Sequence, residues 1–102
     1  MNGANRRRES WEALLRAVTT GPGTLTADVR RAIVDGKAQS GALGALGVKV
    51  AHNAVNVTDE NIRALVDDGQ AEDAVFETII AAAVGAARER LDVGLAALLA
   101  KP

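Results

Sequence analysis

The chain has 102 residues, of which 48% are hydrophobic, only Trp11 and Phe76 are aromatic, and none is cysteine. This length corresponds to a single domain, and the lack of cysteine excludes a disulfide scaffold, a thiolate metal site and dithiol redox chemistry by this chain alone. Twelve basic and thirteen acidic residues give a formal net charge of −1, which argues against nucleic-acid binding. The single histidine argues against a multi-histidine metal site.

Small side chains dominate the hydrophobic residues, because 21 alanines stand beside 10 leucines, 11 valines and 4 isoleucines. An alanine-rich core buries little apolar area per residue, so we expect a partner chain to supply further burial in a homo-oligomer. No apolar run reaches the roughly 18 residues that span a bilayer. The basic run at residues 6–8 is not followed by the apolar segment of a signal peptide. We therefore expect a cytoplasmic protein without membrane contacts.

The first two helices are indicated by capping residues and by a turn sequence. Residues 1–8 are polar and are expected to form a disordered tail. Ser10 can cap a first helix, which the Gly-Pro-Gly sequence at residues 21–23 ends. Thr26 is a plausible N-cap for a second helix, whose apolar spacing runs to Gly36.

The next segment is rich in glycine, with Gly41, Gly44 and Gly47 at every third position. Each glycine costs about 0.8–1 kcal/mol relative to alanine in an exposed helix, but glycines let backbones approach closely. Apolar residues continue beyond them at helical spacing. We therefore predict a helix over about residues 40–56.

The clearest helix start is Thr58, which is followed by two acidic residues in the first turn. This helix is expected to end at Gly69. From residue 72 onward, apolar side chains recur at helical spacing, which predicts one helix of about 28 residues and roughly 42 Å. The fold class is therefore all-α, with about five helices in a single domain at residues 9–102 and a long C-terminal helix.

His52 is the strongest candidate for chemistry, because histidine is the side chain that commonly changes charge near neutral pH. One interpretation is a partly buried histidine that is hydrogen-bonded to a neighbour. The other is a general acid/base at the edge of a glycine-lined cavity. Most acidic residues have structural explanations, either in first helical turns or, for Asp92, in an i,i+4 pair with Arg88. Asp35 and Glu77 have none, so they are the carboxylates that could orient His52.

Three segments carry a resemblance to a known family: residues 48–54 around His52, residues 57–65 with their Thr-Asp-Glu helix start, and residues 69–77 after a glycine. With residues 82–91, their order resembles the carboxymuconolactone decarboxylase and AhpD-like superfamily over about residues 25–98. The resemblance implies an AhpD-like helical bundle that forms trimers or hexamers. In the AhpD branch, two cysteines precede the histidine on one helix, and these positions are Ala45 and Val48 here.

Two functions follow from this resemblance. Without thiolates there is no sulfenic acid and no disulfide, so thiol peroxidase activity is rejected. The favoured function is a helical oligomer that binds a small apolar or acidic ligand, or a partner, without metal or cofactor. The alternative is a cofactor-free, decarboxylase-like lyase or isomerase, in which His52 is the general acid/base and Asp35 or Glu77 orients it.

Overall fold

The computed structural model describes residues 3–37 and 39–100, and this part of the chain contains helices and no strand. The helices are α1 (Gly3–Thr20), α2 (Ala27–Val34), α3 (Gly41–Asn53), a 3₁₀ turn (Ala54–Asn56), α4 (Asp59–Asp67) and α5 (Glu72–Leu99). The predictions of an all-α fold and of a 28-residue final helix are confirmed. Residues 1–2 of the expected tail lie outside the described residues.

The first helix differs from its prediction, because α1 begins at Gly3 and not at Ser10. The basic run at residues 6–8 therefore lies within a helix, where the sequence analysis places a disordered tail. Arginine and glutamate are good helix formers, and the described side chains of these first turns are exposed. Local helix preference, not burial, accounts for the additional turns.

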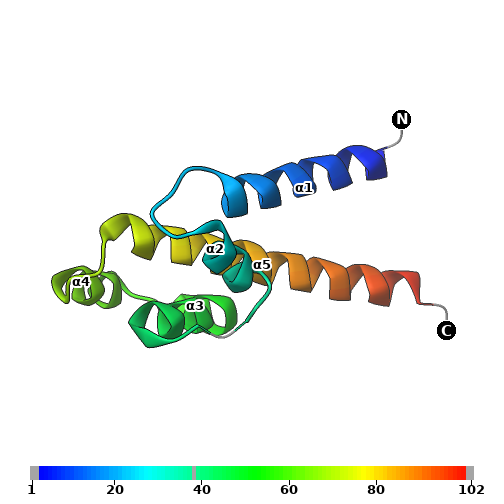
Figure 1. Ribbon diagram of the computed structural model, residues 1–102. Coiled ribbons are helices and arrows are strands. Elements are labelled where there is room, and N and C mark those ends of the chain that lie inside the picture. The colour runs from blue at the N-terminus through cyan, green and yellow to red at the C-terminus, as the bar shows by residue number, and fades with distance from the viewer. Residues whose placement is uncertain (1–2, 38, 101–102) are drawn as a thin grey trace.

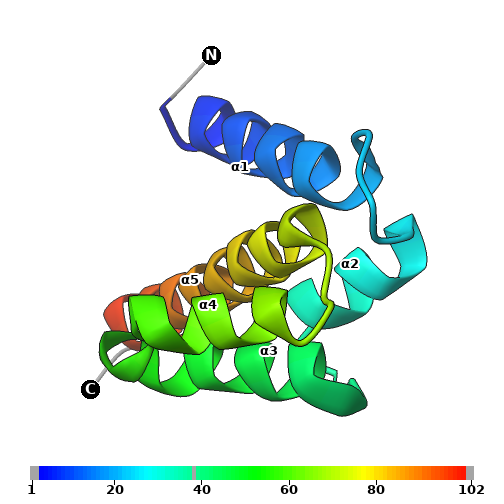
Figure 2. The same cartoon turned by 90° about the vertical axis from the view of Figure 1, so that its left-hand side faces the viewer.

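The long helix α5 is the centre of the molecule and contacts each of the other four α-helices. Helix α1 lies on one side of it, and α3 and α4 lie on the other (Figure 1). The view along the molecule shows these layers separately, with α2 at one edge, between the levels of α1 and α3 (Figure 2). The dimensions of 50 × 31 × 21 Å describe an elongated molecule.

The core lies between α3 and α5, where Leu46 and Val50 pack against Val75 and Ala82. Around them lie partly buried residues of α2, α3, α4, the turn before α4, and α5: Ile33, Leu43, Val57, Ile62, Leu65, Val66 and Ile79. Thr78 is completely buried beside this cluster, and its hydroxyl donates to the carbonyl of Ala74 at 2.8 Å. Its polar group is therefore satisfied within its own helix.

The predicted helix starts and ends are confirmed at several positions. The Thr58 side chain accepts a hydrogen bond from the Asn61 amide, and the Asn61 side chain accepts one from the Thr58 amide, both at 3.1 Å. This capping box satisfies two amides that lack partners within the helix. Gly36 ends α2 with a positive φ of 76°, and the Lys37 amide donates to the Ala32 carbonyl in a Schellman arrangement.

Arg30 joins α1 to α2 from an almost fully buried position, with 6% of the residue exposed. Its guanidinium Nη1 donates to the carbonyl of Val18 at 3.1 Å, in the last turn of α1. A cation is favourable at that end of a helix dipole. Its Nε has no hydrogen-bond partner within the described part of the chain.

Candidate functional site

His52 lies in the last turn of α3, and its side chain is exposed. It makes no hydrogen bond to any described residue. The interpretation of His52 as a partly buried, hydrogen-bonded histidine is therefore wrong. An exposed imidazole at the end of a helix is free to meet a ligand.

A pocket of about 740 Å³ lies beside His52, between the ends of α2 and α3 and the middle of α5. Asp35, the C-cap residue of α2, also lines it, so the structure brings two of the three predicted site residues together. The other charged side chains of the lining are Lys37, Arg88, Glu89 and Asp92. Its apolar part includes Ile33, Ala51, Ala82, Ala86 and Val93.

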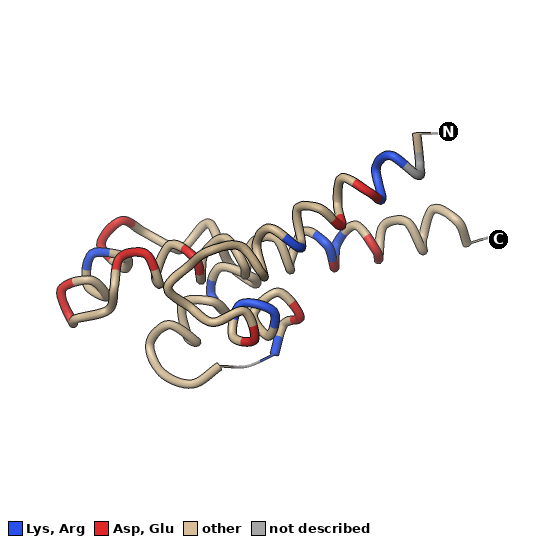
Figure 3. The backbone as a smooth tube through the Cα atoms, turned by 45° about the horizontal axis from the view of Figure 1, so that its top comes forward, with Lys and Arg blue, Asp and Glu red and all other residues tan. Residues whose placement is uncertain are grey.

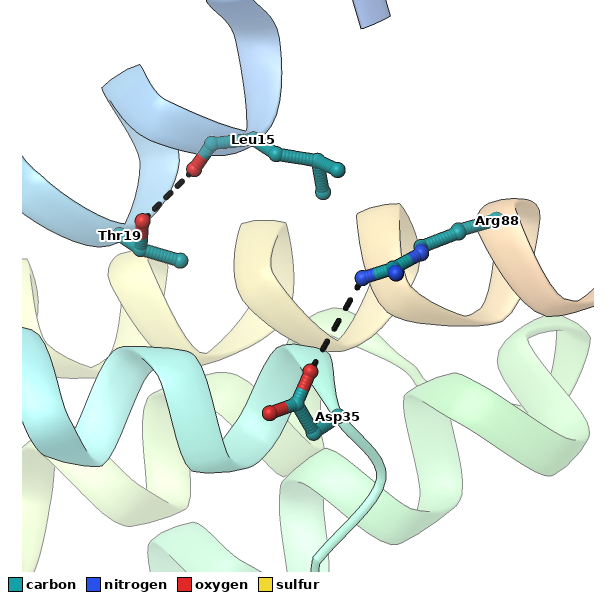
Figure 4. Close-up of polar contacts among 4 residues, drawn as sticks. All are labelled: Leu15, Thr19, Asp35 and Arg88. Carbon is teal, nitrogen blue, oxygen red and sulfur yellow. Dashed lines mark hydrogen bonds and ion pairs between the residues drawn. The ribbon is translucent and has the colours of Figure 1, made fainter. Parts of the chain in front are cut away.

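Asp35 is paired with Arg88 across the pocket, with 3.9 Å between the carboxylate Oδ1 and the guanidinium Nη1 (Figure 4). The two side chains are 40% and 46% exposed, so this long ion pair contributes little to stability. The i,i+4 spacing predicts a pair of Arg88 with Asp92 along the helix, but in the structure Arg88 pairs with Asp35 at the end of α2. Arg88 is therefore part of the site, although its spacing in the sequence indicates a position on the solvent-exposed surface of the helix.

Gly85 sets the distance between the two helices that carry this ion pair. A Cβ atom at Gly85 would collide with the backbone carbonyl of Val34, the last residue of α2. Only glycine lets α5 and α2 cross this closely without displacement of one backbone. The position of Asp35 relative to Arg88 thus depends on a residue without a side chain.

Glu77, the third predicted residue, is not among the residues that line this pocket. Its two carboxylate oxygens accept hydrogen bonds from the amides of Thr24 and Leu25, at 2.8 and 2.9 Å. It therefore anchors the loop between α1 and α2. The sequence could have indicated this role through the short turn between α1 and α2, because the backbone amides of such a turn need hydrogen-bond acceptors.

Ala45 and Val48, the positions where the AhpD branch carries cysteines, are exposed on α3. Val48 and His52 also line a small pocket of about 40 Å³ beside the larger one. The described residues contain no group of three or more potential metal-ligating side chains. None of the described helices is long and apolar enough to cross a membrane.

The chain was compared with family models, with curated proteins and with solved structures, and none of them matches it.

Proposed function

We propose that this chain is a subunit of a helical homo-oligomer whose pocket binds a small organic acid with an apolar body. One observation carries the proposal: His52, Asp35 and Arg88, from three different helices or helix ends, line one pocket of about 740 Å³. This volume is within the usual range of small-molecule sites. Because the chain has no cysteine, the proposed function excludes thiol peroxidase chemistry by this chain alone.

Two of the five charged side chains of the pocket, Arg88 and Lys37, support a carboxylate ligand. Among the described residues Arg88 is held only by the 3.9 Å contact with Asp35, so its planar guanidinium can donate to a second carboxylate. Lys37 lies on the same lining and adds a positive charge. Glu89 and Asp92 are also present and repel a highly charged anion. A monocarboxylate therefore fits this set better than a dicarboxylate.

The apolar part of the lining supports a ligand with a hydrocarbon or aromatic body. Ala82 and Ala86 are buried residues of α5, and Ile33 is partly buried on α2. Burial of an apolar group against such residues contributes about 25 cal/mol per Å². The proposal also includes that the chain belongs to the carboxymuconolactone decarboxylase and AhpD-like superfamily, which its sequence resembles.

Benzoate is a suitable probe, because it joins one carboxylate to a flat apolar ring. The single histidine gives a single set of imidazole signals in a ¹H–¹³C NMR spectrum, so a titration reports directly on the pocket. We expect saturable shifts of the His52 signals with a Kd on the order of 1 mM. Benzamide, which has the same shape without the charge, is expected to bind at least 5-fold more weakly.

Two variants test which residues bind the probe. Arg88→Met retains most of the side-chain volume and is expected to raise the benzoate Kd at least 5-fold without altering the weak binding of benzamide. Glu60→Gln, at an exposed position of α4, is the control and leaves both affinities unchanged. Equal affinities for benzoate and benzamide, or no shift of His52 at 20 mM benzoate, would refute the proposal.

A second candidate function is a cofactor-free lyase or isomerase, which is favoured by the presence of His52 and Asp35 in one pocket. In this function, His52 transfers the proton, and Asp35 orients the imidazole of His52. The test is decarboxylation of the carboxymuconolactone for which the family is named, followed by ultraviolet absorbance. Activity that is lost in His52→Ala and reduced in Asp35→Asn supports the enzyme. No turnover by the native chain above that of His52→Ala rejects it.

A further inference from the structure

The last two turns of α5, residues 93–99, have no polar side chain on any side. They consist of valine, glycine, leucine and alanine only, and Leu98 and Leu99 are 78% and 74% exposed. Five of the nine large hydrophobic residues that are exposed in the described part of the chain lie between Leu91 and Leu99. A helix that is apolar on every side is normally buried.

The whole molecule also exposes more surface than its size requires. A folded monomer of 10.5 kDa exposes about 5400 Å², whereas this chain exposes 7100 Å². The surplus is roughly 1700 Å², which is about twice the 800 Å² that one partner contributes to a complex of standard size. It is comparable with the surface that one subunit buries in an obligate, apolar homodimer interface.

The helices α1 and α5 separate at one end of the molecule, where the last turns of α5 are exposed (Figure 1). The two helices are close near Leu15 and Arg88 (Figure 4). Beyond this point they diverge, and the start of α1 and the end of α5 project in the same direction (Figure 1). Charged residues occur on the projecting part of α1 but not on the last two turns of α5 (Figure 3).

We propose that the last two turns of α5 pair with the same turns of a second copy of this chain about a two-fold axis, with Leu95 and Leu98 at the centre of the contact. A second copy fits because it brings an equally uncharged helix, and because two-fold contacts are the commonest way in which identical subunits join. Seven apolar residues are far too few to span a bilayer.

This contact completes the His52 pocket. Val93, which is 65% exposed at the start of the apolar turns, is also part of the pocket lining, as are Asp92, the preceding residue, and Glu89, one turn earlier. A second copy that packs on residues 93–99 therefore closes the side of the pocket beside Val93. The inference rests on the homo-oligomer of the proposed function and names the surface that forms it.

Sedimentation velocity of the full chain between 1 and 100 µM tests the pairing. We expect a species of two chains, or an even multiple of two, and we expect Leu98→Glu to raise the dissociation constant of the pair at least 10-fold. Val55→Glu is the matched control, because Val55 is also apolar, is 90% exposed and lies in the 3₁₀ turn after α3, outside α5. Circular dichroism checks that both variants keep the native helix content.

Several outcomes would overturn the pairing: a monomer at 100 µM, an odd-numbered oligomer, or an oligomer that Leu98→Glu does not weaken. A monomer that floats with phosphatidylcholine vesicles would show that the apolar turns bind lipid instead. A monomer with a radius of gyration near 13 Å in X-ray scattering would show that α1 closes over them, since the present value is 15.3 Å. Benzoate binding by such a monomer would leave the pocket of the proposed function intact.

Cross-linking locates the contact independently, because the native chain has no cysteine. Leu95→Cys is expected to form an intermolecular disulfide within minutes of mild oxidation, since two-fold symmetry places the two copies of this position close together. Val55→Cys is the control and is expected to stay reduced. Equal cross-linking of the two variants would refute this placement of the axis.

Discussion

Substitution of Gly85 by alanine tests the close crossing of α2 and α5. A Cβ atom at this position would meet the carbonyl oxygen of Val34, and its carbonyl carbon and Cα at 2.9 Å. These are backbone atoms of a helix, so they cannot turn away as the end of a flexible side chain can. One of the two helices has to move.

The expected magnitude follows from two opposing effects. Alanine in place of glycine within a helix stabilises by about 0.8–1 kcal/mol, whereas overpacking of a well-packed contact costs about 1–3 kcal/mol. The contact with Val34 involves three backbone atoms, which places the cost in the upper part of that range. We therefore expect Gly85→Ala to lower the free energy of unfolding by about 1–2 kcal/mol.

Gly47→Ala is a matched control, because Gly47 is a buried helical glycine and Gly85 is a partly buried one. A Cβ atom there would lie 3.6 Å from the Thr78 Cγ2 atom, which is an ordinary van der Waals contact. This variant is expected to gain the helix preference of alanine, about 0.8–1 kcal/mol. The two variants should thus differ by about 2–3 kcal/mol.

Urea denaturation followed by circular dichroism at 222 nm measures the difference, and thermal melting provides a second measurement. A difference of 2 kcal/mol corresponds to at least about 8 °C in Tm for a domain of this size. If Gly85→Ala is as stable as Gly47→Ala, the close crossing of α2 and α5 is not present in solution. The explanation of how Asp35 is placed beside Arg88 would then be wrong.

Three further substitutions test other contacts. Glu77→Gln removes the charge of the acceptor in two hydrogen bonds, so it should lower the free energy of unfolding by about 1–2 kcal/mol and accelerate hydrogen exchange at the amides of Thr24 and Leu25. Unchanged exchange at both amides would contradict the role of Glu77 in anchoring the loop. Thr58→Ala should cost about 1 kcal/mol in urea denaturation, and Thr58→Ser should restore most of it; equal stability of the two variants would contradict the capping role. The free energy of unfolding of Arg30→Met should stay within about 1 kcal/mol of the native value, because the variant replaces a buried cation that has no carboxylate partner. Arg30→Ala should lower it by about 2–4 kcal/mol, because it leaves a cavity. A large loss for both variants would show that the charge of Arg30 itself stabilises the fold.

The elements of the fold were predictable because they depend on neighbours in sequence. Thr26 and Thr58 mark helix starts, and glycines at positions 36 and 69 mark helix ends. The start of α1 was missed because the helix continues through exposed polar residues, which give no apolar spacing in the sequence. Local signals of this kind define where a helix can begin more readily than how far it extends.

The site was only partly predictable, because its members meet through tertiary packing. Asp35 and His52 were selected for chemical reasons, and they do line one pocket. Glu77 was selected by the same argument, yet it binds the loop amides of Thr24 and Leu25. Arg88 was assigned to a helix surface, since its i,i+4 spacing to Asp92 gave no indication that α2 passes beside it. Elimination among carboxylates cannot distinguish a ligand-facing group from one that holds a loop.

The unequal roles of the glycines have a consequence for the recognition of distant relatives. Alanine, leucine and valine at the core positions can be exchanged among many helical proteins, so they identify this architecture poorly. Position 85, and position 44, where a side chain would collide with the Gln39 carbonyl, allow no such exchange, whereas positions 47 and 94 do. A pair of invariant glycines, one early in the third helix and one midway along the last, is therefore the pattern by which a divergent member of this fold could be found.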